Sequence, residues 1–237
     1  MSERDFTYDN RTGRGPGRVV RALGLVVPGV RRVRGQADPY ADAWRLRNLA
    51  SLQDPGRRWI VLGDSMSQSV GATSYDAGWV DQLRDRMAAT GDELSIVNLS
   101  ASGARVPDLL AQQVPAMIAL GSRPDDLVTV LIGSNDLFSG RTHSAALPRA
   151  VYDLLARLPR GAVVATLPQP RPAAEAANAY IEEAGASGQI RIVDMRTAGP
   201  ASWRGKVAAD YFHPNEAGYA AIADAFEPVV RQALAGR

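Results

Sequence analysis

Apolar and polar positions follow two patterns from residue 58 to the end of the chain. Short apolar runs of strand length lie at residues 59–62, 95–99, 127–132, 162–167 and 190–193. Between and after them, apolar residues recur with a helical period, which predicts helices over 79–87, 106–120, 146–158, 173–183 and 216–234. Because strands that alternate with helices form right-handed crossovers, the sequence predicts an α/β fold. We expect a three-layer α/β/α sandwich with a doubly wound, five-stranded parallel sheet.

The N-terminal part of the chain does not show this alternation. Residues 1–17 have no apolar period and end in a cluster of Gly and Pro, which predicts a flexible arm. Residues 41–52 predict a helix that docks on the rest of the molecule, with Leu46, Leu49 and Trp44 on its apolar face.

Charge divides the chain at nearly the same place. The formal net charge is only +2, but residues 1–58 contain twelve Arg against six acidic residues. We therefore divide the chain into a basic N-terminal extension, residues 1–57, partly flexible and partly helical, and a main domain, residues 58–237. The arginine excess alone does not indicate nucleic-acid binding, and we expect no nucleic-acid partner.

The residue types that the chain lacks narrow its chemistry. With no Cys, disulfides, thiolate metal sites, iron–sulfur clusters and a cysteine nucleophile are excluded. Two His do not favour a catalytic zinc site, which needs three well-placed ligands. No P-loop, Rossmann glycine motif or G-x-S-x-G elbow is present. We expect no metal and no cofactor, and a nucleophile that is oxygen or nitrogen.

No apolar stretch near the start of the chain is long enough to cross a membrane. The longest spans residues 22–30 and is interrupted by Pro28, whereas a spanning helix needs about 20 apolar residues. Early acidic residues, and arginines directly after the apolar run, do not fit a secretory signal. We therefore expect a cytoplasmic protein.

Four short motifs stand where the predicted strands end or the last helix begins. Gly63-Asp64-Ser65 follows the first strand, Gly103 follows the second, and Gly133-Ser134-Asn135-Asp136 follows the third. Asp210 and His213 precede the last helix. In open α/β sheets the reactive groups lie beyond the carboxyl ends of the strands, so we expect these motifs to lie together.

A serine nucleophile requires an imidazole within hydrogen-bond reach, and the imidazole requires a carboxylate that fixes its tautomer. His143 lies in a polar stretch, and we interpret it as an exposed loop residue. His213 follows Asp210 by three residues, a spacing that can bring the carboxylate to the second ring nitrogen in a tight turn. The alternative for this pair is a capped helix start, and the presence of Ser65 favours the catalytic interpretation.

The oxyanion that forms when a serine attacks an acyl carbon needs preorganised donors. Three candidates are the backbone N–H of Ser65, the backbone N–H of Gly103 and the side-chain amide of Asn135. We expect Asp136 to form an Asx turn that caps the segment after it, and Asp64 to be a structural hydrogen-bonding residue within its loop.

These motifs resemble the conserved blocks of the SGNH hydrolases, also called GDSL esterases and lipases. The resemblance covers residues 58–237 and implies a flavodoxin-like sheet with Ser65 as nucleophile, His213 as base and Asp210 as its orienting partner. It implies an oxyanion hole made by Ser65, Gly103 and Asn135. The remaining positions of the blocks are supporting residues: Gly63, Asp64, Gly133 and Asp136.

The chain departs from the family pattern in one loop. The first block of the family often continues to a glycine four residues after the serine, where this chain has Ser69, with Gly71 two residues further on. The loop after Ser65 is therefore expected to have its own shape, which bears on leaving-group specificity. The segment YADAWRLRNLASL before the first strand resembles extensions of actinobacterial members of the family.

Three functions are consistent with these residues. The first is a serine ester hydrolase that acts on small acyl esters, lipids or acylated sugars. The second is an acyltransferase or deacylase on a sugar or lipid with the same triad. The third is a peripheral membrane or partner-binding protein, in which basic residues around an apolar stretch contact anionic lipid: Arg18, Arg21, Arg31, Arg32 and Arg34.

Overall fold

The structure is a computed structural model that describes residues 6–15, 27–121 and 123–236 of the 237. Its five parallel strands form one sheet in the order β2-β1-β3-β4-β5, and the predicted fold class is confirmed. The register pairs Val61 of β1 with Asn98 of β2 on one side and Thr129 of β3 on the other. The strands are β1 (Arg58–Gly63), β2 (Ser95–Asn98), β3 (Leu127–Leu131), β4 (Ala162–Ala165) and β5 (Ile190–Val193).

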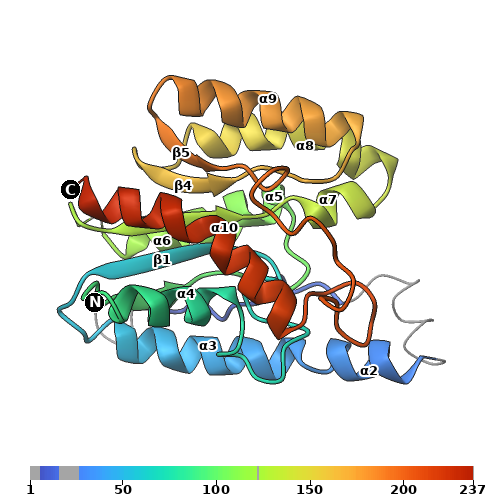
Figure 1. Cartoon of the computed structure of the whole chain (residues 1–237), viewed down its shortest axis with the longest axis horizontal. Helices are drawn as coiled ribbons and strands as arrows, with labels where there is room; N and C mark the ends of the chain where they lie inside the picture. Colours follow the sequence, from blue (N-terminus) through green and yellow to red (C-terminus); the bar gives the residue numbers. More distant parts are fainter. Residues whose placement is uncertain (1–5, 16–26, 122, 237) are drawn as a thin grey trace.

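Helices cover both faces of the sheet, because successive strand residues point to opposite sides. Ile60 and Leu62 of β1 belong to one apolar core, and Trp59 and Val61 belong to the other. Figure 1 shows two of the helices over the first face, α8 (Arg141–Leu155) and α9 (Pro172–Ala186). Helices α4 (Trp79–Ala88) and α10 (Glu216–Ala235) supply the core of the second face. The other helices of the described residues include the short helices α2 (Pro28–Arg34) and α7 (Ser134–Phe138), and α3, α5 and α6 are given below.

The segment predicted as one helix over 106–120 is divided into three pieces. It begins as α5 (Val106–Asp108), continues as a π-helical turn (Leu109–Gln113) and ends as α6 (Val114–Ala119). The wide turn places the buried side chain of Gln113 against Gly63. Gln113 donates to the Gly63 carbonyl at 2.8 Å and accepts from its N–H at 2.9 Å. The helix therefore deviates from α geometry at the point where it binds the end of β1.

Helix α3 (Ala37–Ser51) docks on the body with Trp44 buried and Leu49 packed against the first core, and its predicted apolar face is wrong only for Leu46. The buried side chains are those of Ala41, Trp44 and Asn48, which follow one another at helical spacing, and Leu46 is 65% exposed. Asn48 is wholly buried because its side chain pairs with edge strand β2: it accepts from the Asn98 N–H and donates to the Asn98 carbonyl, both at 2.7 Å.

The interpretation of residues 1–17 as a flexible arm is wrong for its described part, residues 6–15, which we call the N-terminal strap. Phe6 is packed in the first core, and the hydroxyl of Tyr8 donates to the Leu99 carbonyl at 2.6 Å. Asn10 is wholly buried and donates to the carbonyls of Asn98 and Ser100. Side chains of the strap thus bind the carbonyls at and just after the end of edge strand β2, beside which no further strand pairs among the described residues.

The proposed lipid-contacting segment is only partly described. Residues 18–26 lie outside the described residues. Helix α2 exposes Arg31, Arg32 and Arg34 and buries Val33. Within the described ranges no helix is long and apolar enough to cross a membrane. Membrane contact through this segment stays a prediction.

Candidate active site

Ser65 lies in a tight turn directly after β1. Its carbonyl accepts from the N–H groups of Gln68 and Val70, at 3.1 and 3.0 Å, which folds residues 65–70 back on themselves. The side chain of Asp64 accepts from the Met66 N–H at 3.0 Å, so this carboxylate closes the same turn. Ser65 is 7% exposed, which leaves a small part of it open at the carboxyl edge of the sheet.

The loop after Ser65 depends on two residues with left-handed backbone. Ser69, which stands where the family often has glycine, has a φ of 67°, a conformation that glycine adopts without strain. Gly71 has a φ of 104°, and a Cβ there would lie 2.4 Å from the Pro214 carbonyl oxygen and 2.8 Å from Cβ of His213. The absence of a side chain at Gly71 is therefore what lets the histidine loop approach the serine loop.

His213 and Asp210 lie in the long connection between β5 and α10. A hairpin-like pair of hydrogen bonds closes this loop: Ala208 N–H to His213 carbonyl at 2.8 Å and Asn215 N–H to Lys206 carbonyl at 3.0 Å. Within it, Nδ1 of His213 lies 2.6 Å from Oδ2 of Asp210, and Nε2 lies 2.9 Å from Oγ of Ser65. The structure thus brings the three predicted residues into one chain of hydrogen bonds.

Asp210 is held in its ionised form. Burial by itself would raise the pKa of this carboxyl, but the hydrogen bond and the charge of the His213 ring lower it. The N–H groups of Phe212 and His213 also donate to Oδ1, at 3.1 and 3.0 Å. Together these donors hold the pKa of Asp210 below its usual value, so a carboxylate faces Nδ1 of His213 at neutral pH.

Two backbone N–H groups at this edge of the sheet are available to a ligand. Within the described part of the chain, neither the Ser65 N–H nor the Gly103 N–H donates to a protein acceptor. Gly103 has a φ of 76°, and a Cβ there would meet open space. It is therefore the positive φ of this residue, not crowding, that favours glycine.

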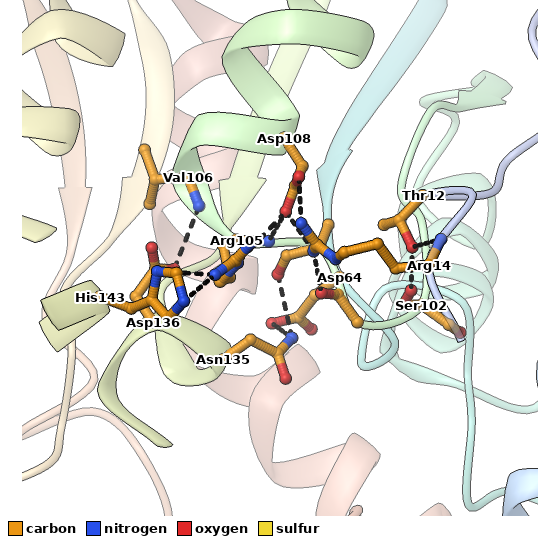
Figure 2. Close-up of polar contacts among 12 residues, drawn as sticks. Thr12, Arg14, Asp64, Ser102, Arg105, Val106, Asp108, Asn135, Asp136 and His143 are labelled. Atoms are coloured by element: carbon orange, nitrogen blue, oxygen red, sulfur yellow. Dashed lines mark hydrogen bonds and ion pairs between the residues drawn. The ribbon is translucent and has the colours of Figure 1, made fainter. Parts of the chain in front are cut away.

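The side-chain amide of Asn135, unlike these two N–H groups, already contacts protein acceptors. It lies on α7, and Figure 2 shows its side chain pointing toward Asp64. Its amide nitrogen is 3.0 Å from the Ala104 carbonyl oxygen and 3.4 Å from Oδ2 of Asp64. The second contact is long and weak, so the hydrogen on the Asp64 side of the amide can be shared with a ligand.

Two buried carboxyls support this region. Burial raises the pKa of Asp64 to about 6, against the hydrogen bond from Met66 and the charge of His213. Burial also raises the pKa of Asp136 to about 6. Asp136 accepts from the Val106 N–H at 3.1 Å, so it caps the start of α5. The expected Asx turn over the following segment is wrong, because residues 134–138 form α7 itself.

His143 is exposed as expected, but it is not in a loop. It lies in the first turn of α8, which begins directly after Gly140. The predicted start at residue 146 is therefore five residues late. Its ring nitrogens lie 2.7 and 2.6 Å from Nη1 of Arg105 (Figure 2). In the described ranges no group of three acidic or His side chains could hold a metal ion.

The sequence did not reveal Gln68 as a site residue, and nothing in its neighbours singles it out. It is wholly buried between the serine turn and the loop after β2. Its Nε2 donates to the carbonyls of Asn10 and Ser100, and its Oε1 accepts from the Ser102 N–H at 2.9 Å. Gln68 therefore ties the nucleophile turn to the Gly103 loop.

A pair of exposed aromatic side chains lies next to His213. Phe212 is 51% exposed and lies edge-on to the His213 ring, and Phe138 packs edge-on against Phe212 with ring centres 5.7 Å apart. Phe138 also forms one wall of an open groove of about 970 Å³, whose other lining residues include Leu137, Arg141, Pro148, Arg171 and Ala173. The guanidinium of Arg171 lies over the Phe138 ring, 4.7 Å from its centre. An apolar groove with two cationic side chains thus lies beside Phe138, which packs against Phe212 next to His213.

Comparisons with known proteins bear on the family and the fold. The model of the GDSL-like Lipase/Acylhydrolase family matches residues 61–221. No curated protein matches the chain. Similar solved structures include TesA (24% identity, TM-score 0.60, 75% of this chain and 100% of that one). A family 3 carbohydrate esterase of Clostridium thermocellum has 18% identity, a TM-score of 0.62 and coverage of 76% and 98%. The lipase/acylhydrolase of Enterococcus faecalis has 18% identity, a TM-score of 0.60 and coverage of 74% and 96%. At these identities the structures share the fold.

Proposed function

Because the chain belongs to the GDSL-like lipase and acylhydrolase family, we propose that it hydrolyses carboxylic esters through an acyl-enzyme intermediate on Ser65. One observation carries the proposal: the continuous contact from Ser65 Oγ through the His213 ring to Asp210, with steps of 2.9 and 2.6 Å. A hydroxyl, an imidazole and an ionised carboxylate in this order form an activated nucleophile.

The reaction begins when Oγ of Ser65 attacks the ester carbonyl carbon and its proton passes to Nε2 of His213. Asp210 accepts from Nδ1 and stabilises the imidazolium that forms. The tetrahedral intermediate collapses as His213 returns the proton to the alkoxide, and the alcohol leaves. Water then attacks the acyl-enzyme with His213 as base, which releases the carboxylic acid and restores the Ser65 hydroxyl.

The negative charge of the tetrahedral intermediate falls between three donors. The N–H groups of Ser65 and Gly103 have no acceptor among the described residues and can donate to it. The amide of Asn135 contributes the hydrogen that otherwise contacts Asp64 at 3.4 Å, while the hydrogen bond to the Ala104 carbonyl keeps the amide in place. Donors fixed in this way stabilise charge without the reorganisation that water would need.

The groove beside Phe138 suits an apolar part of the substrate. We therefore place small acyl esters, lipids or acylated sugars among the substrates, with the apolar group against Phe138 and Phe212, which are each 51% exposed. The actinobacterial subtype and the division of the chain at residue 57 stay predictions.

The test is hydrolysis of a p-nitrophenyl ester series from acetate to palmitate by the wild-type chain and by Ser65→Ala. We expect Ser65-dependent turnover and a loss of roughly 10⁴ to 10⁶ in kcat for the variant, because the nucleophile is removed and the oxyanion donors stay. The melting temperature of Ser65→Ala serves as the folding control. Turnover that persists at wild-type kcat in a folded Ser65→Ala variant contradicts the mechanism.

A further inference from the structure

The N-terminal strap ends at the loop that carries Gly103. Arg11 and Ser102 form an isolated parallel β-bridge, so the strap runs alongside this loop beyond the end of β2. The side chains of Thr12 and Arg14 then turn toward it, and Figure 2 shows Thr12 at Ser102 and Arg14 at Asp108. The last described part of the strap is therefore in contact with one of the proposed oxyanion donors.

The strap contacts both carbonyl groups that flank the Gly103 Cα. Nη2 of Arg14 donates to the Gly103 carbonyl at 3.0 Å, and Oγ1 of Thr12 lies 3.5 Å from the Ser102 carbonyl oxygen. The Ser102 carbonyl and the Gly103 N–H belong to one planar peptide group and point in opposite directions. Gly103 has no side chain to restrain it, and the N–H groups on either side of it are held by Gln68 and by the Ala101 carbonyl. The strap contacts add restraints on the two carbonyls and so help to hold the direction of the Gly103 N–H.

Arg14 is itself fixed by an ion pair with Asp108, the last residue of α5. Nη1 donates to Oδ1 of Asp108 at 2.6 Å, and Nη2 contacts Oδ2, which also accepts from the Arg105 N–H at 2.8 Å. Although burial alone would raise the pKa of Asp108, the contacts with Arg14 and Arg105 lower it, so the carboxylate stays ionised. A planar guanidinium can bind this carboxylate with two nitrogens and the carbonyl with one of the same nitrogens, which a lysine cannot reproduce.

We propose that Arg14 is a positioning residue that holds the Gly103 N–H in the direction required for the oxyanion. This inference rests on the proposed ester hydrolysis. Arg14 has a 39% exposed side chain, so its ion pair adds little to stability, whereas Phe6, Tyr8 and Asn10 anchor the strap through burial. Loss of Arg14 should therefore loosen the 102–105 loop and leave the strap attached.

The chain offers a matched control in Arg11. Its guanidinium pairs with Asp38 and Asp42 of α3 and does not contact the 102–105 loop, although it lies in the same strap. The experiment compares Arg14→Gln with Arg11→Gln in the full-length protein. It measures kcat and KM on the preferred p-nitrophenyl ester, and amide hydrogen exchange at Ser102 and Ala104. Both amides are hydrogen bonded, to Gln68 and to Ala101.

We expect kcat to fall about tenfold in Arg14→Gln, with KM within twofold. A Gly103 N–H that is displaced but present still stabilises the oxyanion in part, so the loss is smaller than when a donor is removed. Exchange at Ser102 and Ala104 should be faster in Arg14→Gln than in Arg11→Gln. A kcat no lower in Arg14→Gln than in Arg11→Gln overturns the proposal, and so does equal exchange in the two variants. If the wild-type chain hydrolyses no ester, or does so without Ser65, the proposed function fails, and the exchange comparison alone then decides whether Arg14 orders the loop.

Discussion

The buried carboxyl of Asp64 should make the free energy of unfolding fall as the pH rises. The side chain is 1% exposed, and burial raises its pKa from 3.8 to about 6. The folded state therefore binds a proton more tightly than the unfolded chain does. The stabilisation is complete below the unfolded pKa of 3.8 and is lost as the pH rises through the folded pKa of about 6. A shift of about two units corresponds to about 3 kcal/mol, of which about 2 kcal/mol is lost between pH 4 and pH 7.

Asp64→Asn removes this titration and keeps an acceptor oxygen for the Met66 N–H. Urea unfolding of both proteins, followed by the fluorescence of the buried tryptophans, gives the free energy of unfolding at pH 4, 5, 6 and 7. From pH 4 to pH 7, the free energy of unfolding of Asp64→Asn should rise by about 2 kcal/mol relative to that of wild type, whatever the difference between the two proteins at pH 4. Asp85→Asn, whose side chain is 67% exposed, controls for the loss of one carboxylate. A difference between Asp64→Asn and wild type that stays constant with pH refutes the reasoning.

Two further substitutions test the geometry of the site. Asn135→Ala should lower kcat by roughly 10² to 10³ on the preferred ester, because it removes one oxyanion donor, and a loss of less than threefold would reassign Asn135 to a structural role. Gly71→Ala should lower the free energy of unfolding by more than about 2 kcal/mol and lower kcat as well, because its Cβ meets the Pro214 carbonyl at 2.4 Å and its φ is 104°. Urea unfolding at pH 7 checks the first effect, and wild-type stability in this variant would show that the two loops do not need their close approach.

The layered fold could be predicted from the sequence because apolar periodicity determines which strands are buried. The same reasoning did not reveal the polar contacts that the strap and α3 make with the body beside their apolar ones. Asn10 and Asn48 are wholly buried because their amides bind the Asn98 backbone, and a pattern of apolar positions does not indicate such buried polar residues. Leu46, which the apolar pattern predicts to be buried, is exposed.

The candidate site shows a similar limit. The motifs indicated that Ser65, His213 and Asp210 would meet, since each follows a strand end or precedes a helix at the same edge of the sheet. They did not reveal that Asn135 contacts Asp64, that Asp136 caps α5 or that Gln68 bridges two loops. These contacts depend on side-chain directions across elements far apart in the chain, which local spacing does not encode.

The π-helical turn at Leu109–Gln113 affects how this segment should be aligned with related chains. A π turn accommodates one residue more than an α turn of similar height. Deletion of one residue there would allow a regular α-helix whose flanking turns keep nearly the same direction, but the widened turn that brings Gln113 against Gly63 would be gone. Gln113 would then lose both hydrogen bonds to Gly63, directly before the Asp64-Ser65 turn. A one-residue gap in this segment therefore belongs between 109 and 113, and a relative that carries it must hold the end of its first strand by other means.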